Sequence, residues 1–369
     1  MAGLSETPIS DRIRISFFGR RNAGKSTLVN AITGQEIAIV SDVPGTTTDP
    51  VSKAMEILPL GPCLLTDTAG LDDEGPLGEE RVRRSLEVLE NTDIAIWVGE
   101  DNGRFSAECA RRGVPVIIYR RGDDVEALKR RIAAVKLNDE PPPLLEDLVR
   151  PGDIVACVCP IDESAPKGRL ILPQQQVVRA LLDAGCTALA CQPAQLQAHF
   201  AAGMPIALVI TDSQAFAAVS EVVPQEVPLT SFSILFARQK GDIAAYRAGV
   251  DAIATLKDGD RVLVAEGCTH HRQCNDIGTT KIPKALAKLT GGKKLEFTFS
   301  SGASFPLATC ERTPFALVVH CGGCMLTRRV VQGRIAACRA AGIPIVNYGI
   351  LLAAANGILM RCQLGNQNG

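Results

Sequence analysis

The segment GRRNAGKST at residues 19–27 restricts the fold of this chain more than any other feature. It fits the pattern G-x-x-x-x-G-K-[ST], follows the strand-like segment RIRISFFG (12–19) and opens the helix-like segment KSTLVNAITG (25–34). Its glycines allow backbone N–H groups to turn inward around phosphate oxygens, and the helix N-terminus adds partial positive charge. We therefore predict a phosphate-binding loop between a strand and a helix.

Two further motifs follow in the order that a nucleotide site needs. Lys25 is expected to reach the β- and γ-phosphates, and Ser26 to bind Mg²⁺. In DTAG (67–70), Asp67 would hold Mg²⁺ through water and the Gly70 amide would sense the γ-phosphate. Between them, PGTTTD (44–49) supplies a switch threonine, Thr47 or its neighbour Thr46, which would complete the Mg²⁺ set. The predicted nucleotide contacts are Gly19, Asn22, Ala23, Gly24, Lys25, Ser26, Thr27, Gly70 and Asp123.

These motifs resemble the TrmE/Era-type GTPases, which are related to translation factors. The resemblance implies slow GTP hydrolysis in which Lys25, Thr47 and Asp67 take part. It also implies potassium-assisted hydrolysis, which that group associates with the loop asparagine, here Asn22. Leu71 follows DTAG, so no Ras-like glutamine orients the water there, and Glu79 is the predicted substitute.

The base-recognition motif of that family is incomplete in this chain. N-K-x-D is expected after the strand-like segment 114–119, but Arg120 and Arg121 stand where Asn and Lys belong, and Asp123 is the surviving aspartate. The helix-like segment 124–136 then leads directly into a proline-rich connector. We expect a shortened domain whose guanine specificity rests on the resemblance, because each lost hydrogen bond to the base removes about 1 kcal/mol.

The chain organisation favours an α/β fold with three domains. Short Val/Ile/Ala runs alternate with helical periodicity through most of the 369 residues, which indicates largely parallel sheets. Two connectors divide the chain into domains: the stiff, proline-rich segment NDEPPPLLEDLVRPGD (138–153) and a less distinct boundary at KDGD (257–260). We predict a P-loop GTPase domain at 10–136 and two further α/β domains at 150–256 and 257–369.

Charge and hydropathy exclude several classes of protein. The net charge is −1, whereas sequence-independent nucleic-acid binders and anionic-membrane binders carry a basic excess. The longest apolar run, GILLAAANGILM (349–360), is too short to span a bilayer. The first residues contain no signal-peptide pattern. We expect a cytoplasmic protein without nucleic-acid or membrane partners.

Thirteen cysteines suggest metal or redox chemistry in a reducing compartment. Eight of them lie in apolar patterns, and we expect these to be buried small hydrophobes. The eight are Cys63, Cys109, Cys157, Cys159, Cys186, Cys191, Cys338 and Cys362.

Four of the remaining five cysteines lie with histidines in two segments. VAEGCTHHRQCND (264–276) contains Cys268-x-His270, and FALVVHCGGC (315–324) contains His320-Cys321-x-x-Cys324. Three of the four histidines of the chain, including His271, lie here. Both segments begin with Val-rich runs, so if these are neighbouring parallel strands their carboxyl ends converge on one crevice. A helix starting near Thr327 would favour thiolates through its dipole.

The residues themselves leave the metal open. Three thiolates and a weaker fourth ligand suit an iron–sulfur cluster with an exchangeable iron, Cys3His also suits structural zinc, and a site without metal is the third alternative. Cys274 and Cys310 are candidates for extra ligands, although buried or free thiols are the simpler interpretation.

The combination of the P-loop domain with C-x-H…H-C-x-x-C closely resembles the HydF family of [FeFe]-hydrogenase maturation GTPases, over essentially the whole chain. The resemblance implies a [4Fe–4S] cluster on Cys268, Cys321 and Cys324, with a weak fourth ligand from His270, His320 or outside. It implies that the domain at 150–256 mediates dimerisation and that the domain at 257–369 binds the cluster. It also implies a homodimeric or larger scaffold that carries a di-iron precursor, assembled with the radical-SAM maturases HydE and HydG, to apo-[FeFe]-hydrogenase.

Two alternatives compete with this interpretation. An Era-like or TrmE-like regulatory NTPase with an appended zinc module would show a basic RNA-binding surface, which the charge of −1 does not support. A stand-alone NTPase with a purely structural metal would contain zinc. Iron content after anaerobic purification separates both from the scaffold.

Overall fold

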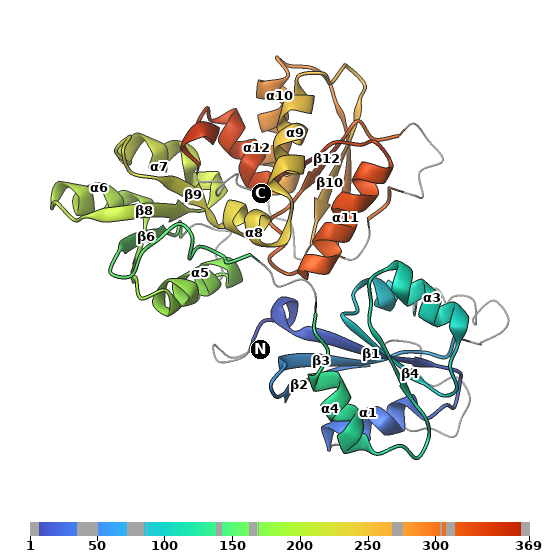
Figure 1. Cartoon of the computed structure of the whole chain (residues 1–369). Coiled ribbons are helices and arrows are strands. Elements are labelled where there is room, and N and C mark those ends of the chain that lie inside the picture. The colour runs from blue at the N-terminus through green and yellow to red at the C-terminus, as the bar shows by residue number, and fades with distance from the viewer. Residues whose placement is uncertain are drawn as a thin grey trace. The chain divides into compact units, whose positions relative to one another are not determined.

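The computed structural model describes residues 7–34, 51–71, 85, 87–137, 142–161, 168, 170–267, 276–302, 305–307 and 314–362. The chain divides into two compact units, Met1–Glu140 and Pro141–Gly369 (Figure 1). Among the described helices, none is long and apolar enough to cross a lipid bilayer.

In the described part of the first unit, five strands form one sheet in the order β2-β3-β1-β4-β5. All pairs are parallel except β2 with β3. The elements are a 3₁₀ turn Ile9–Asp11, β1 Ile13–Gly19, α1 Lys25–Thr33, β2 Val51–Ile57, β3 Gly61–Asp67, β4 Ile94–Val98, α3 Gly103–Arg111, β5 Val116–Tyr119 and α4 Val125–Ala133.

Alternation along β1 explains the layers of this unit. Phe17 faces the core formed with α1 and α4, whereas its neighbour Phe18 faces Phe105 of α3, with ring centroids 4.9 Å apart. Successive strand residues point to opposite faces, so one strand anchors helices on both sides. Figure 1 shows α1 and α4 on one side of the sheet and α3 on the other.

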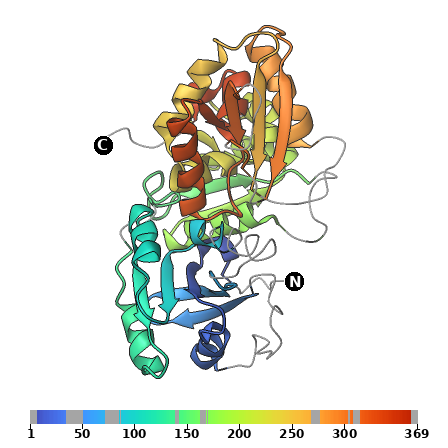
Figure 2. The same cartoon turned by 90° about the vertical axis from the view of Figure 1, so that its right-hand side faces the viewer.

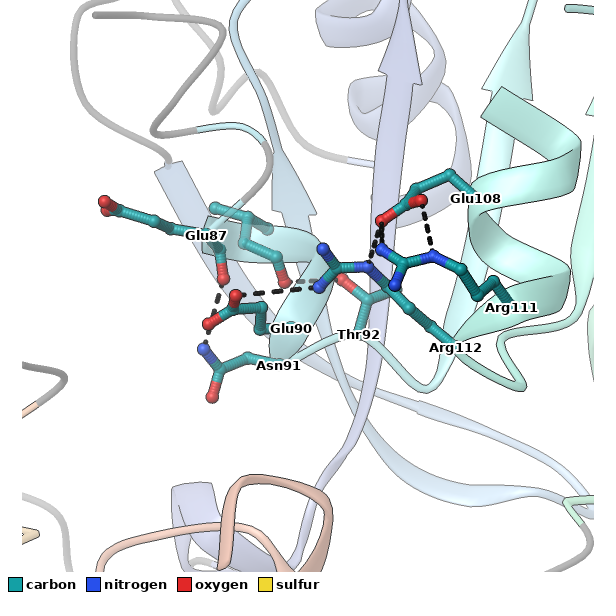
Figure 3. A network of polar contacts seen from close by, with 8 residues as sticks. Glu87, Glu90, Asn91, Thr92, Glu108, Arg111 and Arg112 are labelled. Atoms are coloured by element: carbon teal, nitrogen blue, oxygen red, sulfur yellow. Dashed lines mark hydrogen bonds and ion pairs between the residues drawn. The ribbon is translucent and has the colours of Figure 1, made fainter. Parts of the chain in front are cut away.

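A polar network ties the end of α3 to the segment before β4 (Figure 3). Glu108 accepts hydrogen bonds from Arg111 and Arg112, and Arg112 also approaches Glu90 at 3.6 Å. The two arginines lower the pKa of Glu108 to about 2. Because these side chains are largely solvated, we expect the network to orient the helix end rather than to stabilise the unit strongly.

In the described part of the second unit, eight strands form two parallel sheets, ordered β7-β6-β8-β9 and β11-β10-β12-β13. The elements of the first are β6 Ile154–Val158, α5 Leu172–Asp183, β7 Thr187–Cys191, α6 Pro193–Ala201, β8 Ile206–Thr211, α7 Phe216–Val222, β9 Leu229–Ser231 and α8 Phe232–Lys240. Those of the second are α9 Ile243–Ile253, β10 Arg261–Glu266, a π turn Ile277–Lys281, α10 Ile282–Leu289, β11 Glu296–Ser301, β12 Leu317–His320, α11 Arg328–Ala340, β13 Ile345–Asn347 and α12 Tyr348–Ala355.

The two sheets of the second unit share one hydrophobic core. Buried residues from β6 and α7 belong to the same cluster as residues from β10, β12 and α12. Figures 1 and 2 show α10 and α11 on opposite sides of the C-terminal sheet, as right-handed crossovers to its two edges require. The expected α/β architecture with largely parallel sheets is confirmed.

Helix α9, which the sequence places at the end of the middle domain, packs against the C-terminal sheet. A Cβ added at Gly249 would lie 2.0 Å from the carbonyl oxygen of Ile345 in β13. The helix and the strand therefore meet backbone to backbone, and only glycine permits this approach.

We expect Gly249→Ala to lower the free energy of unfolding of the second unit by about 3 kcal/mol, because α9 must move away from β13. Gly333→Ala is the matched control: Gly333 also lies inside a helix, with nothing within 4 Å of an added Cβ. This control is expected to raise stability by up to about 1 kcal/mol. Chemical denaturation measures both, and equal midpoints for the two variants would contradict the packing.

The eight cysteines expected in apolar patterns are all buried, which confirms that interpretation. Burial raises the pKa of several of these thiols, for example that of Cys338 to about 12. They therefore remain protonated and behave as small hydrophobes.

Candidate functional site

The loop between β1 and α1 has the backbone that the phosphate motif requires. Gly19 has φ +155°, and a Cβ there would lie 2.6 Å from the carbonyl oxygen of Val98 on β4. Gly24 is left-handed at φ +94° and is the N-cap of α1, and Asn22 has φ +57°. The turn thus depends on glycines at the two ends of the motif.

Lys25 curls back over this loop. Its ammonium donates to the carbonyl oxygens of Arg20 at 2.9 Å and Gly19 at 3.3 Å, and only 7% of the residue is exposed. A positive charge is therefore held at the N-terminus of α1, where phosphate oxygens bind in such loops.

Asp67 ends β3 and faces the same loop. It is 2% exposed, and Ser26 Oγ donates to its Oδ2, while Oδ1 is buried without a hydrogen-bond partner. Burial raises the pKa of Asp67, and the Ser26 hydrogen bond opposes that rise. A buried carboxylate oxygen next to a serine hydroxyl fits the oxygen ligands of Mg²⁺.

The DTAG segment docks directly on the phosphate loop. A Cβ at Gly70 would lie 2.8 Å from the backbone nitrogen of Arg21, and the Leu71 N–H donates to the Gly19 carbonyl at 3.2 Å. The Thr68 hydroxyl donates to the Phe17 carbonyl at 2.7 Å. The two predicted phosphate motifs are therefore brought together by the pairing of β1 with β3.

Three predicted residues lie outside the described part of the chain: Thr46, Thr47 and Glu79. Asp123 is exposed, and its Oδ2 accepts the Arg120 N–H at 2.8 Å, which closes the turn after β5. Its part in reading the base stays a prediction.

The cysteine–histidine segments follow two neighbouring strands. β10 and β12 are parallel, with Ala265 opposite His320, so their carboxyl ends meet as the sequence predicts. The Gly267 N–H, at the end of β10, donates to Cys321 Sγ at 3.0 Å, and the Gly323 N–H donates to the same sulfur at 3.4 Å. Two backbone donors on one sulfur suit a thiolate ligand.

Burial raises the pKa of the Cys321 and Cys324 thiols, that of Cys324 to about 11. A bound cation would therefore be needed to hold them as thiolates. Together with a third thiolate they would form a soft donor set for iron or zinc. No group of three metal-binding side chains occurs among the described residues. The other predicted ligands, Cys268 and His270, lie outside them, as do His271, Cys274 and Cys310.

His320 is engaged through both ring nitrogens. Its Nδ1 donates to the Cys321 carbonyl at 2.7 Å, so its Nε2 accepts from Arg334 Nη1 at 3.1 Å. Burial, followed by the charge of Arg334, lowers the pKa of His320 to about 4. In this geometry both ring nitrogens are engaged, so His320 would have to give up one hydrogen bond to bind a metal, and its role as a weak fourth ligand stays a prediction.

Sequence reasoning missed several residues that hold the CGGC loop (321–324). Asn347, the last residue of β13, donates to the Cys321 carbonyl at 3.3 Å, and Lys240 of α8 donates to the Leu326 carbonyl at 2.9 Å. Neither residue belongs to a recognisable motif. Lys240 is the last residue of RQK (238–240), which follows the mostly apolar segment 229–237, and a lysine in that position gives no signal of its own.

Comparisons with known proteins assign all three parts of the chain. Residues 14–121 match the family of 50S ribosome-binding GTPases, residues 144–241 the hydrogen maturase F dimerization domain, and residues 244–363 the hydrogen maturase F tetramerization domain. The chain belongs to the hydrogen maturase F (HydF) family. Membership confirms the predicted resemblance and the α/β architecture that begins with a GTPase domain.

Curated relatives match over about a quarter of the chain. The tRNA modification GTPase MnmE of Methylobacterium sp. (strain 4-46) is 42% identical over 113 residues, 29% of this chain and 26% of that protein. GTPase Der of Heliobacterium modesticaldum is 46% identical over 92 residues, 24% of this chain and 21% of that protein. The chain thus spans about a quarter of the length of these relatives.

Among solved structures, an Era variant from Aquifex aeolicus bound to GDP·AlF4⁻ is 15% identical, with a TM-score of 0.25. That match covers 78% of this chain and 93% of the Era chain.

Proposed function

We propose that this chain is the GTP-binding scaffold of [FeFe]-hydrogenase maturation. It holds a [4Fe–4S] cluster through Cys268, Cys321 and Cys324, with His270 or an exogenous group as the weak fourth ligand. It carries a di-iron precursor bearing CO and CN⁻, receives it with the help of HydE and HydG, and delivers it to apo-[FeFe]-hydrogenase. The family assignment of residues 144–363 supports this role and a homo-oligomeric state.

One contact carries the proposal. Gly267 N lies 3.0 Å from Cys321 Sγ, and Gly267 is covalently bonded to Cys268. Backbone 54 residues away in sequence therefore lies against Cys321 at the carboxyl end of β10, and this supports the proposal that Cys268 serves the same site.

The protein groups around the site have defined tasks. The Gly267 and Gly323 N–H groups offset negative charge on Cys321, and Cys324 is half-buried against the core cluster that contains Phe232 and Phe236. The cluster, when bound, supplies an iron with an exchangeable position to which cargo can attach. A scaffold that must release its cargo needs such a weakly held ligand.

The nucleotide site supplies the switch rather than the cluster chemistry. Lys25, Ser26 and Asp67 bind the phosphates and Mg²⁺, with K⁺ near Asn22 and slow hydrolysis of GTP as the outcome. Switch segments that order around a γ-phosphate and relax after hydrolysis change the affinity for partner proteins.

Anaerobic purification of the full chain, followed by reconstitution with iron and sulfide, tests the proposal. We expect about four irons per chain and a broad absorption near ~400 nm. Stoichiometric zinc in a colourless protein that binds no iron would instead support a regulatory NTPase with a structural zinc module.

A further inference from the structure

Lys240 is a buried lysine that points at the cysteine loop. Only 4% of the residue is exposed. Its ammonium donates to the carbonyl oxygens of Leu326 at 2.9 Å, Cys324 at 3.3 Å and Gly323 at 3.5 Å, and lies 5.3 Å from the centroid of the Phe236 ring. Lysines are rarely buried so fully, and a charge in this position is expensive unless its surroundings use it.

The lysine and the loop come from different sheets. Lys240 ends α8, which follows β9 of the middle sheet, whereas the loop follows β12 of the C-terminal sheet. Side chains of α11, the helix that follows the loop, in turn donate to the backbone carbonyl groups at the end of α8. Arg328 donates to the Gln239 carbonyl at 2.7 Å, and Gln332 donates to the carbonyls of Lys240 at 3.0 Å and Gly241 at 2.9 Å.

The start of α8 touches the same loop. A Cβ added at Gly322 would lie 3.1 Å from Ser233 Oγ. The Cys324 side chain packs on the core cluster that contains Phe232 and Phe236 of α8. The CGGC loop therefore contacts α8 near both of its ends, and this helix, which follows the middle sheet, forms one wall of the cysteine site.

We propose that Lys240 is a positioning residue for the iron–sulfur site: it fixes the backbone of Gly323–Leu326 so that Cys324 is held as a ligand, and it sets a positive charge beside the cluster. The inference rests on the proposed function. A cluster ligated by three thiolates is an anion, and its reduction adds another negative charge. The Lys240 ammonium therefore favours both retention of the cluster and its reduced form.

The position of Lys240 also links the middle domain to the proposed cluster site. Lys240 lies within residues 144–241, which match the dimerization domain. A displacement of α8 in an oligomer interface would move the ammonium and, through three carbonyls, the backbone of Cys324.

The test compares Lys240→Met with wild type in the full-length, reconstituted protein. Methionine keeps the apolar stem and removes the charge and the donors. Lys240→Arg keeps both, and Lys240→Gln keeps N–H donors without charge. Arg361→Met is the matched control, because Arg361 also bridges to three backbone carbonyls, those of Ser220, Val223 and Pro224, but touches none of residues 321–326.

Two measurements report on the cluster and a third on the fold. We expect Lys240→Met to lose iron to a chelator about 10-fold faster than wild type and to lower the midpoint potential followed by EPR. Lys240→Arg should restore both properties. Lys240→Gln should fold and keep the lowered potential, even if Lys240→Met unfolds. Arg361→Met should change only the unfolding midpoint of the apoprotein.

Wild-type iron release and potential in both Lys240→Met and Lys240→Gln would overturn the positioning role while leaving the scaffold intact. Equal iron loss from Arg361→Met would also overturn it, because the effect would then be general destabilisation. A wild-type protein that binds no cluster would overturn the proposed function and this inference together.

Discussion

Replacing Lys25 by alanine is expected to reduce GTP hydrolysis about 100- to 1,000-fold, the loss typical of removing one preorganised donor from a transition state. The ammonium is buried and directed into the phosphate loop by the carbonyls of Gly19 and Arg20. Single-turnover hydrolysis with saturating GTP measures the loss.

Lys129→Ala is the control for that experiment. Lys129 lies on α4 and pairs with Glu126 at 2.8 Å on the surface, so its removal should leave hydrolysis unchanged. If Lys25→Ala hydrolyses GTP at the wild-type rate while Lys129→Ala does too, the loop is not the hydrolytic site.

The second large effect concerns Cys321. Cys321→Ser is expected to reduce the iron content from about four per chain to below about one, because a serine hydroxyl is a hard, protonated and weak ligand for this metal. The sulfur that it replaces is the acceptor of the Gly267 and Gly323 N–H groups. Iron and sulfide analysis after reconstitution measures the effect.

Cys338→Ala controls for the loss of a thiol near the site. Cys338 is fully buried on α11, in the core cluster against which Cys321 packs. The Cys338→Ala variant should retain the full iron content. Iron loss from Cys338→Ala as large as that from Cys321→Ser would show that packing, rather than ligation, controls the iron content.

The parts of the site that were predictable from the sequence are those whose determinants are local. The phosphate loop is one continuous motif, and its glycines adopt the left-handed backbone that the motif requires. The sequence predicted that the carboxyl ends of the two Val-rich runs converge if the strands are parallel neighbours, and the pairing of β10 with β12 meets that condition. Both inferences need only short segments and a general rule.

The missed features depend on contacts between distant segments. Arg334 of α11 donates to His320 Nε2, and no spacing in the sequence predicts that pair. Lys240 meets Cys324 across 84 positions. The close approach at Gly249 appears only when α9 and β13 are both in place. Pattern reasoning assigns residues to elements, but it does not tell which elements pack against each other.

The hydrogen bonds between Lys240 of α8 and the CGGC loop join two segments that the ribosome synthesises at different times. At roughly 5–20 residues per second, Lys240 emerges from the ribosome about 4–17 s before Cys324. The two sides of the proposed cluster site are thus synthesised at separate times, and Asn347, which donates to the Cys321 carbonyl, is made later still. A nascent chain halted before residue 347 lacks that hydrogen bond, so the CGGC loop gains all its described contacts only after synthesis has passed that point.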